Sequence, residues 1–242
     1  MKTTKILKIS SVLAIVLMIS ALFFTGCTTP NNNSIQIHYD YPVSLGAEEM
    51  AEMADFVVIG KYEKLEKTWN MRRDINDVTK ESETDYVEGR LYRFTVSEVV
   101  KGDFTESSIL VNHRYIERIN LEKSDAVIDE TGIIVKPATK TEIITLNIQD
   151  SLYIEPEIGG TYMLFLSKDS NFGNYYGATE PFMVKIENDK AILQSNLIDK
   201  KGDFSSSVKA RNGDLIEVKI GAVSIKDTVT GMTLEELKAA IK

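Results

Sequence analysis

The sequence predicts a mainly β protein, an antiparallel OB-like barrel with an inserted hairpin and a short helix near each end. Many short runs alternate apolar and polar residues, which is typical of half-buried strands. Segments rich in glycine, proline and asparagine separate these runs, as turns do. Within the predicted folded region, helical spacing of apolar residues occurs only near 44–54 and 233–242, so helices contribute little to the fold.

The first half of the folded region begins with a predicted helix. Ser44 is its candidate N-cap, the helix runs to about Ala54, and Leu45, Met50 and Met53 share one face. The apolar run 56–62 follows as a central strand, because both of its faces are apolar at the start. The remaining expectations here are a long charged loop at 63–89, strands at 90–100 and 108–115, a second charged loop at 116–131, and an inserted hairpin formed by 133–135 and 143–148.

The second half is predicted to hold four strands and a closing helix. The strongly apolar run 161–166 follows Gly159 and Gly160, and 171–177 is expected to be a loop. The other expected elements are a hairpin of 182–186 with 191–193, a polar connection at 199–213 and a strand at 215–220. Thr233 and Glu236 have the spacing of a capping box, which predicts a final helix with Leu234, Leu237 and Ile241 facing inward.

Residues 1–26 have the features of a bacterial lipoprotein signal peptide. Three lysines precede an apolar run from Ile9 to Phe24, and small residues lead to Cys27, the single cysteine of the chain. The run has 16 residues, fewer than the roughly 20 that a membrane-spanning helix needs. We therefore expect cleavage before Cys27 and lipid attachment to its sulfur. A cleaved signal without lipid and an uncleaved anchor are the alternatives.

The domain organisation expected beyond the signal is a lipidated tether at 27–43 and a single β-barrel domain at 44–242. Removing residues 1–26 leaves 216 residues and takes away three lysines, so the formal net charge moves from −8 to −11. An acidic domain is a poor partner for nucleic acid. The expected partners are the membrane, through the lipid at Cys27, and a protein or glycan; the expected location is the outward face of the cell membrane, or the outer membrane where the host has one.

Three segments together carry a resemblance to a known family. They are ADFVVIGK at 54–61, YRFTVSEVVKG at 92–102 and IGGTYMLFL at 158–166. In order and spacing they resemble secreted bacterial domains with a netrin-like OB barrel, related to tissue inhibitors of metalloproteinases. The resemblance covers about half of the mature chain and implies the fold only, since its motifs consist of core and turn residues. Protease inhibition is not implied, because the animal inhibitors use disulfides and a free N-terminal cysteine.

The candidate binding residues lie in two loops. Trp69 is the only tryptophan and lies with Arg72 and Arg73 in the predicted loop between the first two strands, which borders the binding face in OB barrels. The alternative is that Trp69 folds back as a lid over one barrel end. Tyr175 and Tyr176 lie in a glycine- and asparagine-flanked loop and are a second candidate, as a small aromatic platform.

Catalytic and metal-binding patterns are weak in this sequence. No phosphate-binding glycine loop, nucleophile elbow or zinc-protease motif occurs, and no cofactor or metal is predicted. Of the two histidines, His38 falls in the tether and His113 is expected to be an exposed strand-end residue. Glu155 and Glu157 flank Pro156 and are expected to be solvated. The same is expected of the acidic loop with Asp125, Asp129 and Glu130, whose spacing matches no calcium loop.

The function favoured by the sequence is that of a membrane-anchored, non-catalytic binding or envelope-associated module. The alternative is a carboxylate-dependent hydrolase that acts on cell-wall or extracellular polymer, for which Glu155 and Glu157 are the only candidate pair.

Overall fold

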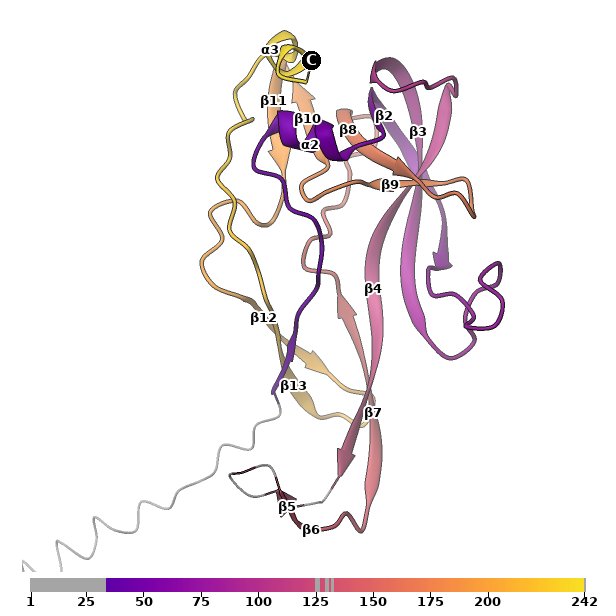
Figure 1. The fold of residues 1–242 in the computed structure, drawn as a ribbon, viewed down its shortest axis with the longest axis vertical. Coiled ribbons are helices and arrows are strands. Elements are labelled where there is room, and N and C mark those ends of the chain that lie inside the picture. The colour runs from indigo at the N-terminus through magenta and orange to yellow at the C-terminus, as the bar shows by residue number, and fades with distance from the viewer. Residues whose placement is uncertain (1–33, 125–126, 129–130, 132, 242) are drawn as a thin grey trace, which may run out of the picture. The chain divides into compact units, whose positions relative to one another are not determined.

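The computed structural model of the protein describes residues 34–124, 127, 128, 131 and 133–241 (Figure 1). The predicted signal peptide, Cys27 and the acidic residues Asp125, Asp129 and Glu130 lie outside them. The fold is mainly β, as the sequence predicts. Residues Ser34–Lys242 form one compact unit.

The elements of that unit, in chain order, are β1 Ser34–Ile37, α2 Ala47–Met53, β2 Phe56–Asn70, β3 Tyr86–Lys101, β4 Ser108–Ser124, β5 Val127–Ile128, β6 Ile134–Lys136, β7 Thr141–Gln149, β8 Thr161–Lys168, β9 Tyr175–Gly177, β10 Met183–Glu187, β11 Lys190–Gln194, β12 Phe204–Lys209, β13 Leu215–Ile220 and α3 Leu234–Ala239.

Five strands form a closed ring of hydrogen bonds. β2 pairs with β3, β3 with β4, β4 with β9, β9 with β8, and β8 with β2 again. All of these pairs are antiparallel except β4 with β9, where Val111 lies beside Tyr175 in parallel register. A buried cluster draws residues from all five strands, including the fully buried Tyr62, Phe94 and Leu164. The ring therefore has a filled interior.

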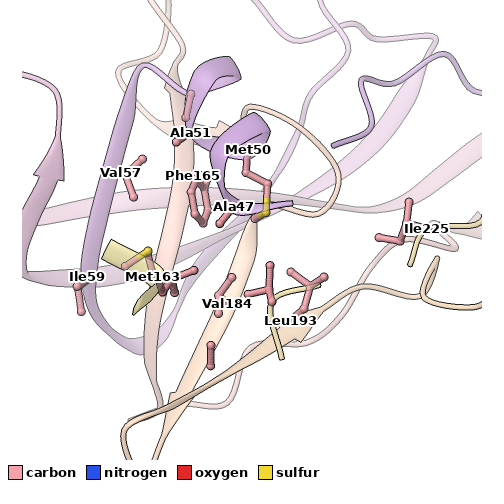
Figure 2. Packing of buried hydrophobic residues seen from close by; sticks show 14 of the residues in the cluster. Ala47, Met50, Ala51, Val57, Ile59, Met163, Phe165, Val184, Leu193 and Ile225 are labelled. Carbon is pink, nitrogen blue, oxygen red and sulfur yellow. The ribbon is translucent and has the colours of Figure 1, made fainter. Parts of the chain in front are cut away.

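A second core lies on the other face of β8 (Figure 2). Leu164 and Leu166 belong to the ring cluster, whereas Met163 and Phe165 pack with Met50 of α2 and with residues of β10 and β11. Alternate β8 side chains thus enter two cores, which explains why this strand is an uninterrupted apolar run. The capping box of α3 is present as predicted: the Thr233 hydroxyl accepts a hydrogen bond from the Glu236 N–H at 3.2 Å, and Leu237 is buried.

A third core lies beyond the ring, between β7 and the small sheet β1–β13–β12 (Figure 1). β4 is 17 residues long, and its C-terminal part pairs with β7 from Ile116 to Ser124. Leu146 of β7 and Val218 of β13 are fully buried in this core. The long strand β4 therefore belongs both to the ring and to the strands around the third core.

Several predicted boundaries are wrong. The loop expected at 63–89 is limited to 71–85, since β2 continues to Asn70 and β3 begins at Tyr86. The loops expected at 116–131, 171–177 and 199–213 contain, respectively, the end of β4, all of β9 and all of β12. The expected partners 133–135 and 143–148 do not form a hairpin with each other, because β6 pairs with β5 and β7 with β4. The hairpin of β10 and β11 is confirmed.

The start of the folded unit also differs from the prediction. β1 pairs in parallel with β13, so residues 34–43 of the expected tether belong to the folded unit. Ser44 does not cap α2, because the N-cap of this helix is Gly46. Instead Ser44 is buried, and its hydroxyl forms a hydrogen bond of 2.7 Å with the hydroxyl of Thr179. Met50 is fully buried, but Leu45 and Met53 are exposed. A soluble fragment beginning at residue 44 would therefore lack a strand of the third core.

Candidate functional site

A pocket of about 540 Å³ lies among the described residues. Its walls come from residues 39–42, the end of β2 and the loop after it, the middle of β4, residues 150–154, the β8–β9 connection and the segment that leads into β10. The volume lies within the roughly 300–1,000 Å³ of small-molecule sites. Segments far apart in the sequence therefore form one site.

Trp69, Arg73 and Phe172 form the aromatic wall of the pocket. The guanidinium carbon of Arg73 lies 3.7 Å from the ring centroid of Phe172 and 4.5 Å from that of Trp69. The two rings meet edge to face with centroids 5.4 Å apart. Arg73 makes no ion pair in the described part of the chain, and its buried Nη2 has no hydrogen-bond partner there. Among the described residues, the guanidinium of Arg73 is therefore stabilised by cation–π contacts and not by an ion pair.

The position of Trp69 depends on two residues of neighbouring strands. Its indole Nε1 donates a hydrogen bond of 2.8 Å to Oδ1 of Asn112 on β4. Gly89 on β3 lies directly opposite Trp69 in the β2–β3 pair. A Cβ at Gly89 would overlap both the indole nitrogen and the Asn112 oxygen, so a glycine is required for this close approach.

His113 lies on a pocket wall formed by β4, and the expectation that it is exposed is wrong. Only 5% of it is exposed. Its Nε2 shares a hydrogen bond of 2.9 Å with the hydroxyl of Tyr62, and the rings of Tyr62, Tyr92 and Phe182 surround it. Burial lowers the pKa of His113 from 6.5 to about 3 because the imidazolium would lose its hydration. The imidazole is therefore neutral at physiological pH.

Two buried carboxyl groups contribute to the pocket lining. Burial raises the pKa of Glu180 from 4.5 to about 7, although the Ser195 hydroxyl donates a hydrogen bond of 2.7 Å to its Oε1. Burial also raises the pKa of Asp150, whose Oδ2 lies 3.7 Å from Nε of Arg114. No cation lies within ion-pair distance of Glu180 in the described residues. Of the two carboxyl groups, Glu180 is therefore the one whose ionised form a positively charged or hydrogen-donating partner would stabilise more.

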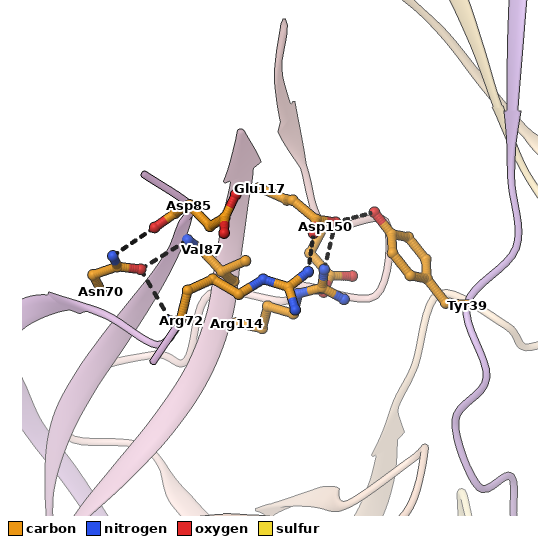
Figure 3. A network of polar contacts seen from close by, with 8 residues as sticks. All are labelled: Tyr39, Asn70, Arg72, Asp85, Val87, Arg114, Glu117 and Asp150. Atoms are coloured by element: carbon orange, nitrogen blue, oxygen red, sulfur yellow. Dashed lines mark hydrogen bonds and ion pairs between the residues drawn. The ribbon is translucent and has the colours of Figure 1, made fainter. Parts of the chain in front are cut away.

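A polar network supports the loop beside the pocket (Figure 3). The side-chain amide of Asn70 donates to the carbonyls of Ser82 and Asp85, and its oxygen accepts from the N–H groups of Arg72 and Val87, at 2.8–3.0 Å. Asn70 therefore fixes both ends of the loop at 71–85.

Glu117 is the centre of the second part of this network. Its carboxylate accepts hydrogen bonds from Arg72 at 2.7 Å, Arg114 at 2.6 Å and the Tyr39 hydroxyl at 2.9 Å. Burial and the nearby Glu117 charge raise the pKa of Tyr39 to about 12. These bonds tie the loop, β4 and the N-terminal segment together around the pocket.

The structure brings three of the five candidate binding residues into one site. Trp69, Arg73 and Tyr176 line the pocket, and Trp69 is half-buried at the end of a strand rather than in a loop. Arg72 lies outside it and pairs with Glu117. Tyr175 is 2% exposed and packs inside the ring, so an aromatic platform of Tyr175 with Tyr176 is wrong.

The pair Glu155 and Glu157 is exposed, as expected. Glu157 lies 2.8 Å from Lys185, and Glu155 lies 3.8 Å from Arg90. Among the described residues, no group of three or more His, Cys, Asp or Glu side chains is placed to hold a metal ion. The acidic loop with Asp125, Asp129 and Glu130 falls outside those residues.

Comparison with family models, curated proteins and solved structures finds no match to this chain. Within the described residues, none of the helices has the length and apolar character needed to cross a bilayer.

Proposed function

We propose that this chain is a lipid-anchored extracytoplasmic module that binds a ligand in the pocket of an OB-like barrel without catalysing a reaction. The single observation that carries the proposal is the pocket itself, a cavity of about 540 Å³ with several aromatic side chains in its walls and a lining surface that is mostly apolar. Pockets of this size, largely apolar with a small number of polar side chains, are typical of small-molecule sites.

The place of the pocket in the ring supports an OB-like barrel. In the proposed barrel, the five strands would be β2, β3, β4, β8 and β9, taken in chain order. OB barrels bind ligands through the loops between strands 1 and 2 and between strands 4 and 5. Here those loops are 71–85 and 169–174, and Arg73 and Phe172 from them stack on each other at the pocket.

The anchor is supported by the sequence. A basic start, a 16-residue apolar run and a cysteine after small residues are the features of a lipoprotein signal. Lipid at Cys27 would hold the acidic domain at the outward face of the cell membrane, or at the outer membrane where the host has one. A net charge of −11 after cleavage makes the domain a poor partner for nucleic acid, whereas a small molecule, or the end of a protein or glycan chain, suits the pocket.

The hydrolase alternative has weak support, because its candidate pair, Glu155 and Glu157, is exposed and lies beside Arg90 and Lys185. A pKa near 7, as at Glu180, is the value that acid–base catalysis needs. However, in the described part of the chain the Ser195 hydroxyl is the one hydrogen-bond partner of the Glu180 side chain, and no second acid or base lies within hydrogen-bond distance of it. Binding therefore has the stronger support.

Fluorescence provides a direct test because the only tryptophan lies in the pocket wall. The chain from residue 27 onward, with Cys27→Ser to keep it free of lipid, is titrated with the neutral apolar dye N-phenyl-1-naphthylamine. We expect one saturable site with energy transfer from Trp69. Phe172→Ala should weaken it, whereas Tyr86→Ala, outside the pocket, should not. Equal binding by both variants, or no saturable site, would contradict the proposal.

A further inference from the structure

We propose that the ligand of this pocket is a short apolar peptide with free termini, whose carboxylate lies at Arg73 and whose ammonium group lies at Glu180. The inference rests on the proposed binding function and names the chemical class of the ligand. It follows from three features of the pocket: an arginine for which the described residues provide no acceptor, a carboxyl group for which they provide no cation, and the apolar surface that lines the same cavity.

The first feature is the guanidinium of Arg73. An arginine carries five N–H donors and is charged at all physiological pH values. Within the described residues no carboxylate pairs with this one, and its guanidinium carbon lies over the rings of Trp69 and Phe172. Because Nη2 is covered, an incoming carboxylate engages the other nitrogens or shifts a neighbouring side chain, as ligands commonly do. Arginine with a carboxylate forms a strong, charge-assisted pair.

The second feature is the acidic part of the lining. Within the part of the chain that the structure describes, Asp150 has an arginine at 3.7 Å, whereas Glu180 has no cation within ion-pair distance. Glu180 is 9% exposed, and among those residues its side chain has one partner, the Ser195 hydroxyl at its Oε1. An ammonium group placed at Glu180 supplies both a charge and donors, so it stabilises the ionised form of a carboxyl group that burial disfavours. Asp40, exposed at the rim, adds to the negative potential.

The third feature is the apolar lining, which includes Leu152, Ile154, Phe182 and Met183. A fatty acid would satisfy Arg73 but leave Glu180 without a partner, and a neutral sugar would satisfy neither charge. A peptide with apolar side chains and two free termini provides an anion, a cation and an apolar body in one molecule. The opposite charges of the pocket favour it over those two classes.

Calorimetric titration with the dipeptide Phe-Leu and its two blocked forms tests this assignment. The protein is the chain from residue 27 onward with Cys27→Ser. We expect Phe-Leu to bind at least tenfold more tightly than either the N-acetylated or the C-amidated form. In Arg73→Gln the preference for the free carboxylate should disappear, and in Glu180→Gln the preference for the free amine. Arg73→Lys should keep part of the first preference, because it keeps the charge.

Matched controls remove the same charges elsewhere. Arg211→Gln and Glu52→Gln alter exposed residues outside the pocket and should leave both preferences unchanged. Equal binding of all three ligands to the unaltered pocket would overturn the inference without any variant, and so would the absence of Phe-Leu binding. Saturable dye binding without Phe-Leu binding would overturn the peptide assignment alone, whereas the loss of both would overturn the binding function as well.

Discussion

Glu180→Gln should change the way in which the stability of this protein depends on pH. The substitution keeps the shape of the side chain and an oxygen that accepts from the Ser195 hydroxyl, which lies 2.7 Å from Oε1. It removes a carboxyl group whose pKa burial raises from 4.5 to about 7. Any change in the pH profile of the free energy of unfolding then reports the titration of this one group.

The sign follows from the raised pKa. The folded protein holds the proton of Glu180 more tightly than the unfolded chain does, so this group stabilises the fold fully below pH 4.5. The contribution is lost as the pH rises through 7. The interval from 4.5 to about 7 corresponds to about 3 kcal/mol of unfolding free energy.

His113 acts in the opposite direction. Its pKa is lowered from 6.5 to about 3, so it stabilises the fold above pH 6.5 and the contribution is lost as the pH falls. Between pH 7.5 and 4.5 this loss amounts to about 3 kcal/mol. The two groups therefore nearly cancel over this range in the natural sequence, and Glu180→Gln should uncover the acid sensitivity caused by His113.

The assay is urea unfolding followed by circular dichroism at pH 4.5, 6.0 and 7.5. The stability of Glu180→Gln relative to the natural sequence should fall by about 3 kcal/mol between pH 7.5 and 4.5. The same comparison for Glu52→Gln, an exposed residue, should be flat. A flat difference for Glu180→Gln as well would refute the reasoning.

Three further predictions concern the anchor, the pocket and the last helix. Cys27→Ser should abolish labelling of the protein by a radioactive fatty acid in cells, and labelling at the natural level would contradict lipid attachment. Gly89→Ala should displace the indole of Trp69 from Asn112, shifting its fluorescence emission to longer wavelength and weakening dye binding; an unchanged emission spectrum would show that the strands absorb the extra methyl group. Thr233→Ala removes the capping box and should lower the unfolding free energy by about 1 kcal/mol in urea titrations, whereas Thr105→Ala, at an exposed residue outside the helices, should leave it nearly unchanged.

The strands that the sequence identifies correctly have either one clear apolar face or, as in β8 and the start of β2, an uninterrupted apolar run. Phe94 is fully buried while Thr95 beside it is exposed, so simple alternation identifies β3. The end of β4 has the same pattern at Ile119 and Leu121, but charged residues surround them and both are only partly buried. Such a segment resembles a charged loop because its stabilising partners, β7 and β13, lie elsewhere in the chain.

The site is predictable only in part for a related reason. Trp69 and Arg73 stand out by residue type, since an aromatic ring beside an arginine is a common interface pattern. Glu180 and Asp150 have no local motif, because it is the packing of distant segments that removes water from their carboxyl groups. Likewise His113 is buried by Tyr62 and Phe182, residues about 50 and 70 positions away, which no local pattern indicates.

The parallel pairing of β1 with β13 bears on how this protein withstands mechanical load. The register joins Ser34 to Glu217 and Ile37 to Ile220, so the strand that enters the folded unit from the N-terminus lies along one from near the C-terminus. A force that pulls the N-terminus along β1 loads all the hydrogen bonds of this pair together, instead of breaking them one after another. If the proposed lipid at Cys27 anchors the chain, β1 is the first strand of the folded unit to bear drag on the domain, and its Ile35 and Ile37 side chains pack against the third core.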